Sequence, residues 1–506
     1  MGIGKNSIVK NTFFNLFGGI VPVIIGFISI PFAIKGLGKD GFGVLTIGWI
    51  VLGYFGLFDL GFSQATTKFS SQYLSKDDTE KFNSVFWVSL ITSLGMGSIG
   101  SIIFFIFTPL LINRILTIPV SLLLDAKNTF LILGGMLPII IATTSLRGIM
   151  AASNRFDLLN KIQMPSNILT YIIPCLSYVF GFSLTLVIIL ISVMRLSVFL
   201  IYLYFSFSLH PYISRKPTFD KKIFKSMLGF GGWISLSNFV SPLLVYFDRF
   251  LIGSLISVAS VSFYTAPYEL VIRTRLFPNA IMESIFPKFS SIDIEDGVQT
   301  ISDLFLKSFK YITIVMSFIV FIFLTYSYEI LYLWLGDIFA ETSKNVLQIL
   351  AIGLFFNAIA TVPFFLLQGI GKPNIPAKIH VLELFIFSTM FYFMIKYYGL
   401  NGAAITWTCR TFFDFILLSF ATYKVQKKIF LGEEVKMILR LFLIIILTLG
   451  VSYYLQIITH SLIIKISFSI FFGWIMAFLI WNFTINNLEK KMILHRISVF
   501  YNRFIN

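Results

Sequence analysis

The chain contains fourteen apolar stretches, each long enough to cross a lipid bilayer as a helix. A spanning helix needs about 20 mostly apolar residues. Only 12% of the 506 residues are charged, whereas soluble domains carry about 25%. The pattern predicts an all-α polytopic membrane protein with almost no soluble domain. The predicted spans are 13–35, 42–63, 82–109, 128–151, 162–181, 183–207, 226–252, 256–283, 308–335, 343–370, 377–398, 400–423, 437–457 and 462–485.

The basic residues gather on one side of these spans. With the N-terminus placed in the cytoplasm, 27 of the 39 Lys and Arg residues fall in inner segments and 8 at outer ends and loops. The remaining four lie inside spans. Because Lys and Arg accumulate on the cytoplasmic side of membrane proteins, both termini are predicted to be cytoplasmic. The net charge of +16 is therefore a topology signal, and no nucleic-acid partner is expected.

Short motifs recur half a chain apart, at offsets of 213 to 221 residues. The offset corresponds to six spans, so the two copies would insert with the same orientation. This predicts two six-helix lobes related by a pseudo-twofold axis along the membrane normal, 1–215 and 222–430, with 432–506 supplying the last two helices and a cytoplasmic tail. The matching pairs are Leu146–Ile149 with Leu367–Ile370, Lys68–Ser71 with Lys288–Ser291, Phe17–Gly19 with Phe230–Gly232, and Arg195 with Arg410.

Four motifs carry a resemblance to a known family. They are Asn11–Gly19 at the entry to a first span that contains Pro31, Gly36–Val44, Phe58–Gly61 at the end of the second span, and Tyr246–Gly253 with its Asp-Arg pair in the seventh. This arrangement resembles the polysaccharide-transport branch of the multidrug/oligosaccharidyl-lipid/polysaccharide (MOP) exporters, whose best-known members are the Wzx O-antigen flippases. Many of those flippases have twelve spans, whereas fourteen is closer to exporters of capsule-like polymers and to lipid II flippases.

The resemblance implies a transporter, and no enzyme activity is expected. The implied function is a flippase for a polyprenyl-diphosphate-linked oligosaccharide, such as an O-antigen unit, working by alternating access in the bacterial inner membrane. Membrane lipids, a polysaccharide polymerase and chain-length proteins are the implied partners. The alternatives are a multidrug exporter of the same fold, a lipid II flippase and, from a different class, a membrane-embedded polysaccharide polymerase.

Charged residues inside spans are costly and therefore mark candidate sites. Arg273 lies near mid-depth in the eighth span, one helical turn from Glu269, and Arg275 would face away from it on a continuous helix. The resemblance places this helix beside the central cavity, where Arg273 would grip the anionic head of the substrate. The other candidates for substrate binding are Arg275, Arg249, Asp248, Arg147 and Lys35, and those for ion coupling are Asp59, Asp248 and Glu269.

Further charges in spans are predicted to be structural. His380 and Glu383 lie close enough to the inner face to reach the headgroups, and Arg195 and Arg410 are expected at the periphery of the lobes. The sequence has no P-loop and no His or Cys cluster with metal-ligand spacing. No cofactor, metal or ATP is therefore expected, and an ion gradient is the predicted driving force.

Overall fold

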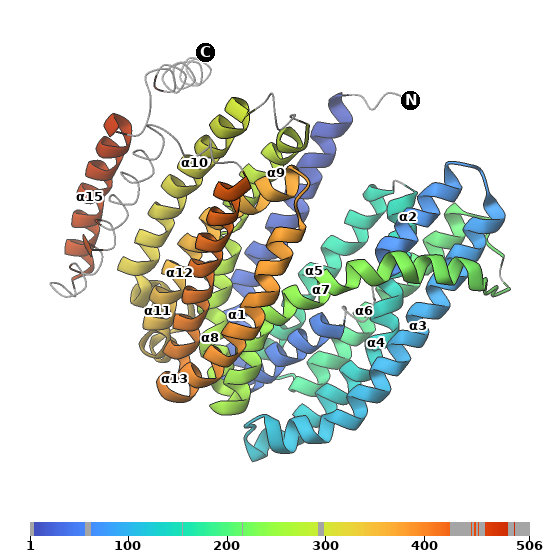
Figure 1. Cartoon of the computed structure of the whole chain (residues 1–506). Helices are drawn as coiled ribbons and strands as arrows, with labels where there is room; N and C mark the ends of the chain where they lie inside the picture. The colour runs from blue at the N-terminus through green and yellow to red at the C-terminus, as the bar shows by residue number, and fades with distance from the viewer. Residues whose placement is uncertain are drawn as a thin grey trace, which may run out of the picture. The chain divides into compact units, whose positions relative to one another are not determined.

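The computed structural model describes residues 5–55, 62–153, 155–214, 216–291, 298–425 and 461–483, with a few single positions beyond 446, and its regular elements there are all helical. Figure 1 shows their arrangement along the chain. The helices are α1 (Lys5–Phe55), α2 (Phe62–Leu74), α3 (Thr79–Leu110), α4 (Leu123–Ala152), α5 (Phe156–Phe180), α6 (Leu184–Leu209), α7 (Lys221–Leu255), α8 (Val258–Arg273), α9 (Leu276–Ser291), α10 (Val298–Thr325), α11 (Ser327–Leu335), α12 (Asp337–Gly369), α13 (Asn374–Val425) and α15 (Leu462–Phe483), with single turns at Leu111–Ile115 and Val120–Leu122.

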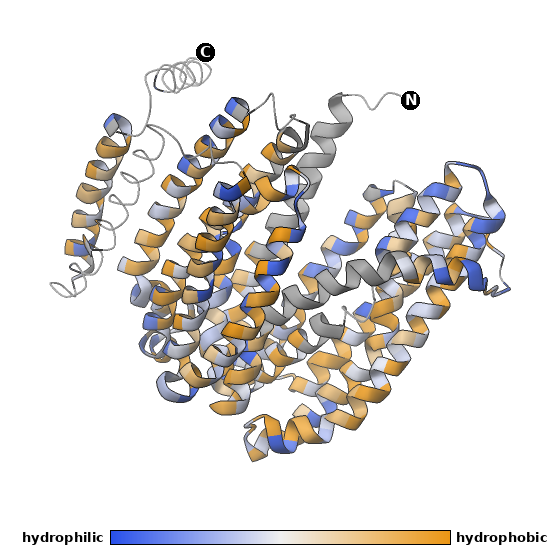
Figure 2. Ribbon diagram, viewed as in Figure 1, coloured by the Kyte–Doolittle hydropathy of each residue, from blue (hydrophilic) through white to orange (hydrophobic). Residues whose placement is uncertain are grey.

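Seven helical stretches in the described part are long and apolar enough to cross a membrane: Thr79–Ile115, Val120–Ala152, Leu184–Leu209, Gln299–Thr325, Asp337–Gly369, Asn374–Val425 and Ile463–Asn482. Figure 2 shows apolar residues along the lengths of the helices rather than in one interior. This confirms an all-α polytopic membrane protein. The predicted span 437–457 lies almost entirely outside the described residues.

In two of the predicted pairs of spans, two helices meet at a glycine with non-helical backbone angles, and the pairs are labelled together as α1 and α13. Gly38 in α1 has φ 73° and ψ 168°, and Gly399 in α13 has φ 57° and ψ −136°. Residues with a side chain rarely adopt positive φ, whereas glycine does so at little steric cost. Each kink falls between two predicted spans, so the chain reverses there without a loop.

The predicted eighth span is not one continuous helix. α8 ends at Arg273 and α9 begins at Leu276, with Thr274 and Arg275 held between them by tight backbone hydrogen bonds to Val271 and Ile272. Pro278 explains the break, because it has no N–H to donate to the carbonyl of Thr274 and its ring crowds that carbonyl. The expectation that Arg273 and Arg275 lie on one regular helix is therefore wrong.

The described residues form two compact units. The first comprises Met1–Ala266 and Leu384–Ala403, and the second Pro267–Glu383 and Ala404–Asn506. The two units are defined by which residues pack together, and this is a different property from similarity between two halves of the chain. The lobes 1–215 and 222–430 therefore remain a prediction.

In the first unit α4 is the central helix, in contact with α2, α3 and α6, while α1 packs along α5. Small residues allow close approach: a Cβ on Gly148 would lie 2.7 Å from the carbonyl oxygen of Ser63 on α2. A corresponding close contact exists in the second unit, where a Cβ on Gly369 of α12 would lie 2.6 Å from the Cβ of Phe289 on α9. At each of these two contacts, the partner helix packs so closely that only glycine fits.

In the second unit α12 is the core helix. Of the residues in its apolar 18-residue stretch, 67% are buried, whereas only 17% are buried in the corresponding stretch of α15. A helix that is apolar all round and still exposed is one that faces lipid. α15 is fixed to the unit by polar contacts. Lys465 Nζ lies 2.6 Å from Glu329 Oε1, and the hydroxyl of Tyr326 donates to Ser469 Oγ at 2.7 Å.

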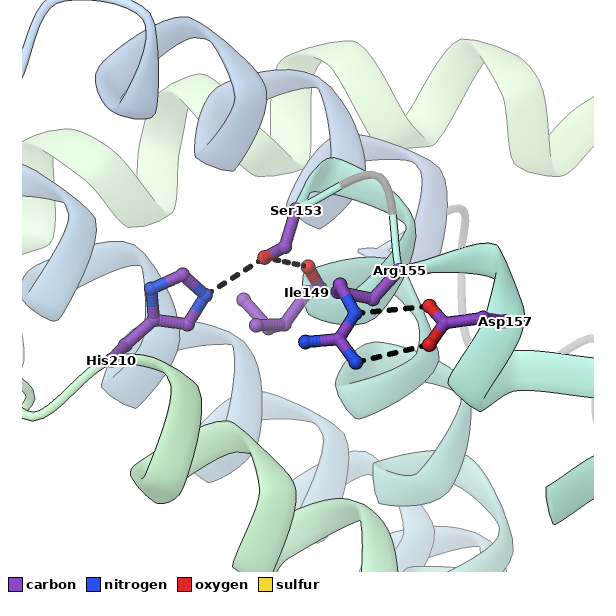
Figure 3. Close-up of polar contacts among 5 residues, drawn as sticks. All are labelled: Ile149, Ser153, Arg155, Asp157 and His210. Atoms are coloured by element: carbon purple, nitrogen blue, oxygen red, sulfur yellow. Dashed lines mark hydrogen bonds and ion pairs between the residues drawn. The ribbon is translucent and has the colours of Figure 1, made fainter. Parts of the chain in front are cut away.

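The connection after α6 is fastened to the end of α4 by a buried histidine (Figure 3). Ser153 Oγ donates to the carbonyl oxygen of Ile149 at 2.8 Å, so His210 Nε2 must donate to Ser153 Oγ, 2.8 Å away. His210 Nδ1 then accepts from the hydroxyl of Tyr212 at 2.6 Å. Burial lowers the pKa of His210, which favours this neutral form.

Candidate functional site

The second unit brings seven ionisable side chains from α8, the turn after it and both halves of α13 into one region. The first pair is the predicted one on α8. Arg273 Nη2 lies 3.0 Å from Glu269 Oε2, and both side chains are partly exposed. At this distance the pair is a charge-assisted hydrogen bond. The carboxylate therefore offsets at least part of the charge of Arg273.

Arg275 is in a different situation. Its side chain is half-buried in the turn between α8 and α9, and among the described residues it makes no hydrogen bond or ion pair. Arg410 and Asp414 of α13 and Tyr268 of α8 lie within electrostatic range of it. A guanidinium withdrawn from water without a partner is costly, so Arg275 is the side chain here that most needs an anion.

Four residues on α13 form a cluster that the sequence did not reveal. His380 and Glu383 precede the Gly399 kink, whereas Arg410 and Asp414 follow it. Arg410 Nη1 lies 3.8 Å from Glu383 Oε2, and His380 Nε2 lies 3.5 Å from Asp414 Oδ1. The two halves thus run antiparallel and bring their ionisable side chains together across the hairpin. We call His380, Glu383, Arg410 and Asp414 the α13 cluster.

One prediction changes with this geometry. Glu383 is only 1% exposed, so its side chain does not reach the surface of the protein, as snorkelling to headgroups would require. Arg410 faces Glu383 within the second unit. The signal that could have found the cluster is the spacing: i,i+3 for His380 and Glu383 and i,i+4 for Arg410 and Asp414 place each pair on one face of its helix.

The α13 cluster resembles a cation site in one respect. The acceptor atoms of His380, Glu383 and Asp414 all lie within 4.8 Å of one another. The guanidinium of Arg410, however, already places a fixed positive charge 3.8 Å from Glu383. That charge repels a divalent ion, so we do not assign these residues as metal ligands.

Asp248 and Arg249, in the first unit, are fully buried at 1% and 2% exposure. The hydroxyl of Tyr264 donates to Asp248 Oδ2 at 2.8 Å, and the backbone N–H of Arg249 donates to Asp248 Oδ1 at 2.7 Å. These contacts give the carboxylate a structural role between α7 and α8.

The remaining candidates are more dispersed. The side chains of Lys35, on α1, and Arg147, on α4, are exposed. Asp59 lies outside the described residues. Arg195, on α6, is partly buried and its Nε makes no hydrogen bond with the described residues.

Comparisons with known proteins identify the family. The polysaccharide biosynthesis protein family matches residues 8–293. A Shigella flexneri protein named "Putative O-antigen transporter" is 31% identical over 413 residues, which are 81% of this chain and 97% of that protein.

Solved structures share the fold. The lipid II flippase MurJ in an inward closed conformation has a TM-score of 0.68 at 16% identity, over 98% of this chain and 100% of MurJ. An inward-facing multidrug resistance MATE family transporter of the MOP superfamily has a TM-score of 0.66 at 14% identity, over 80% of this chain and 95% of that chain. With its family match over residues 8–293 and its relative at 31% identity, the chain belongs to the polysaccharide biosynthesis protein family, and it shares the fold of MOP-superfamily transporters.

Proposed function

We propose that the protein is a flippase that moves a polyprenyl-diphosphate-linked oligosaccharide from the cytoplasmic to the outer leaflet of the bacterial inner membrane. Family membership and the O-antigen transporter named among its relatives support this class of substrate. Both termini would be cytoplasmic, which the distribution of basic residues supports. A polysaccharide polymerase and chain-length proteins would receive the translocated unit.

The observation that carries the proposal is the surplus of guanidinium groups around α8. Arg273 is offset by Glu269 at 3.0 Å, whereas Arg275 has no ion pair among the described residues. A diphosphate carries the charge and the oxygen geometry that a planar guanidinium binds through two parallel hydrogen bonds. We assign Arg275 and Arg273 as the residues that hold the diphosphate while the polyprenyl tail stays in the bilayer.

Transport by this route requires at least two states, open to either side of the membrane. A substrate can shift the balance between them only through its different affinity for each. Glu269 is a candidate for coupling to an ion gradient, because a cation that competes for its carboxylate would release Arg273 to the diphosphate. Asp248, the other described candidate, is already satisfied by Tyr264 and a backbone N–H, which makes it a weaker one.

The MATE-like fold makes a multidrug exporter the second candidate. Cationic drugs would meet the unpaired positive charge of Arg275, which disfavours them. A lipid II flippase would use the same diphosphate chemistry. Lipid II and the proposed oligosaccharide substrate differ in their sugars, so the arginines cannot distinguish them.

The test is surface-polysaccharide display by cells in which the chromosomal gene is replaced by variants. A hydrogen bond to a charged group is worth about 1.5–3 kcal/mol, so Arg275→Ala should lower display about tenfold or more. Arg275→Lys keeps the charge but loses the planar fork, and should lower it less. We expect Arg273→Lys to weaken transport and Arg273→Ala to abolish it.

Arg155→Ala is the matched control, since Arg155 pairs with Asp157 in an exposed connection between helices. Each variant's amount in the membrane is measured by immunoblot, because a stranded Glu269 could impair folding. Full display by both Arg275→Ala and Arg273→Ala at normal protein levels would contradict the diphosphate site. Loss of lipid II export, with the surface polysaccharide intact, would assign the substrate to peptidoglycan instead.

A further inference from the structure

The α13 cluster differs from the other ion pairs of the second unit in its contact distances. Lys465 and Glu329 meet at 2.6 Å and Arg273 and Glu269 at 3.0 Å, which are hydrogen-bonded distances. Arg410 and Glu383 are 3.8 Å apart, beyond the range of about 2.7–3.2 Å for such bonds. Both carboxylate oxygens of Glu383 and Oδ1 of Asp414 have no hydrogen bond in the described structure.

This looseness matters because both carboxylates of the cluster are buried. Glu383 is 1% and Asp414 8% exposed, and the ring of Phe364 on α12 stacks on His380 at 5.9 Å between centroids. An ionised carboxylate without water or hydrogen bonds is strongly disfavoured. A neutral, protonated carboxyl group in the same place loses far less on burial.

The ionisable groups around Glu383 lie on α13 and around the α8–α9 turn. On α13 itself they are His380, Arg410 and Asp414. Arg275 in the α8–α9 turn lies within electrostatic range of Arg410 and Asp414, and the Glu269–Arg273 pair on α8 is internally compensated.

We propose that the α13 cluster is a proton-binding site, with the carboxylate of Glu383 taking up and releasing one proton. With Glu383 ionised, its charge compensates Arg410. With Glu383 protonated, Arg410 and Arg275 outnumber the one remaining carboxylate, Asp414, and the region attracts an anion more strongly. Proton binding stands on the cluster alone, whereas coupling it to flipping rests on the function proposed above.

The direct test is infrared spectroscopy of the full-length protein in lipid membranes, titrated from alkaline to acidic pH without substrate. We expect the band of a protonated, dry carboxyl group to appear on acidification and to be lost in Glu383→Gln. Glu341→Gln is the matched control, because Glu341 is an exposed carboxylate paired with Lys344 at 2.7 Å, and it should retain the band. A band that persists in Glu383→Gln would overturn the proposal.

Two neighbouring variants make the test specific to the cluster. Arg410→Gln removes an attractive charge, so the proton should stay bound to a more alkaline pH, by about one unit or more. Asp414→Asn removes a like charge and should move the midpoint of the titration in the opposite direction. Shifts of the same sign, or none in either variant, would show that Glu383 does not titrate within this cluster.

Failure of the site and failure of the flippase function can be told apart. At fixed acidic pH, absence of the band in choline chloride as well as in NaCl would overturn the assignment to a proton, whereas loss of the band only when NaCl replaces choline chloride would show that Na+ competes with the proton for Glu383. If the band behaves as expected and Glu383→Gln removes the pH dependence of surface-polysaccharide display, coupling is supported. If the band behaves as expected but display is unaffected by Glu383→Gln, the proton site stands and its link to flipping is refuted.

Discussion

At the scale of single residues, the hydrogen bonds of two buried acids, Asp248 and Glu383, distinguish a structural carboxylate from a candidate proton-binding one. Asp248 is satisfied by the hydroxyl of Tyr264 and by a backbone N–H, whereas the oxygens of Glu383 have no hydrogen bond in the described structure. Both lie in apolar helices and are about equally buried. The difference lies in their partners. Hydrogen bonds to a carboxylate favour its ionised form, and their absence in a buried position favours the protonated form.

His210 gives the prediction at this scale. Its folded-state pKa is lowered by burial from an ordinary value of 6.5. Below about pH 6.5 the unfolded chain therefore binds a proton that the folded chain refuses, and stability falls as the pH falls. Above that pH the group contributes no pH dependence.

We expect the melting temperature of the purified protein in detergent to fall on acidification from about pH 8 to about pH 5.5. In His210→Asn this fall should be smaller, although the variant is less stable at every pH because it loses the bond to Ser153. Tyr212→Phe keeps the imidazole and should keep the fall. An identical pH profile in His210→Asn would show that the acid sensitivity arises elsewhere.

At the scale of elements, each unit has a close contact between two helices at a glycine. The predicted repeat matches these two glycines, because it pairs Leu146–Ile149 with Leu367–Ile370. Gly148 of α4 faces α2 and Gly369 of α12 faces α9, and the adjoining motifs Lys68–Ser71 and Lys288–Ser291 lie on those partner helices. The contacts are of the kind that a repeat of one fold would give. Superposition of the two lobes stays a prediction.

Gly369→Ala should weaken the contact between α12 and α9. The added Cβ would lie 2.6 Å from the Cβ of Phe289 and 3.3 Å from its backbone carbon, so one helix must shift. Overpacking of this kind costs about 1–3 kcal/mol and should lower the melting temperature. Gly473→Ala on α15, with no atom within 4 Å of the new Cβ, should leave it unchanged or raise it. Equal melting temperatures for the two variants would contradict the contact.

At the scale of the whole molecule, the number of spans and their direction are the predictions that matter most for transport. The 27-to-8 bias of basic residues predicts fourteen spans with both ends inside. Reporter fusions after Asn506 should be cytoplasmic and fusions near Asp125 periplasmic. The opposite signal at either position would refute the topology, and with it the predicted direction of each lobe.

The lobes can be checked separately by a solved structure. Superposition of 1–215 on 222–430 should place Arg147 on Gln368 and Arg195 on Arg410. If these pairs fall on helices that do not correspond, the similar offsets arose by chance.

The sequence by itself determined the membrane class, the helical fold and the family. These properties depend on how each segment partitions into lipid and on motifs within one segment, so they can be read locally. Tertiary structure alone decided that Tyr264 satisfies Asp248 and that the two halves of α13 bring Glu383 to Arg410. Such pairings depend on how each helix is rotated about its axis. Because nearly every face of these helices is apolar, the hydrophobic pattern does not specify that rotation, and close packing between helices sets it.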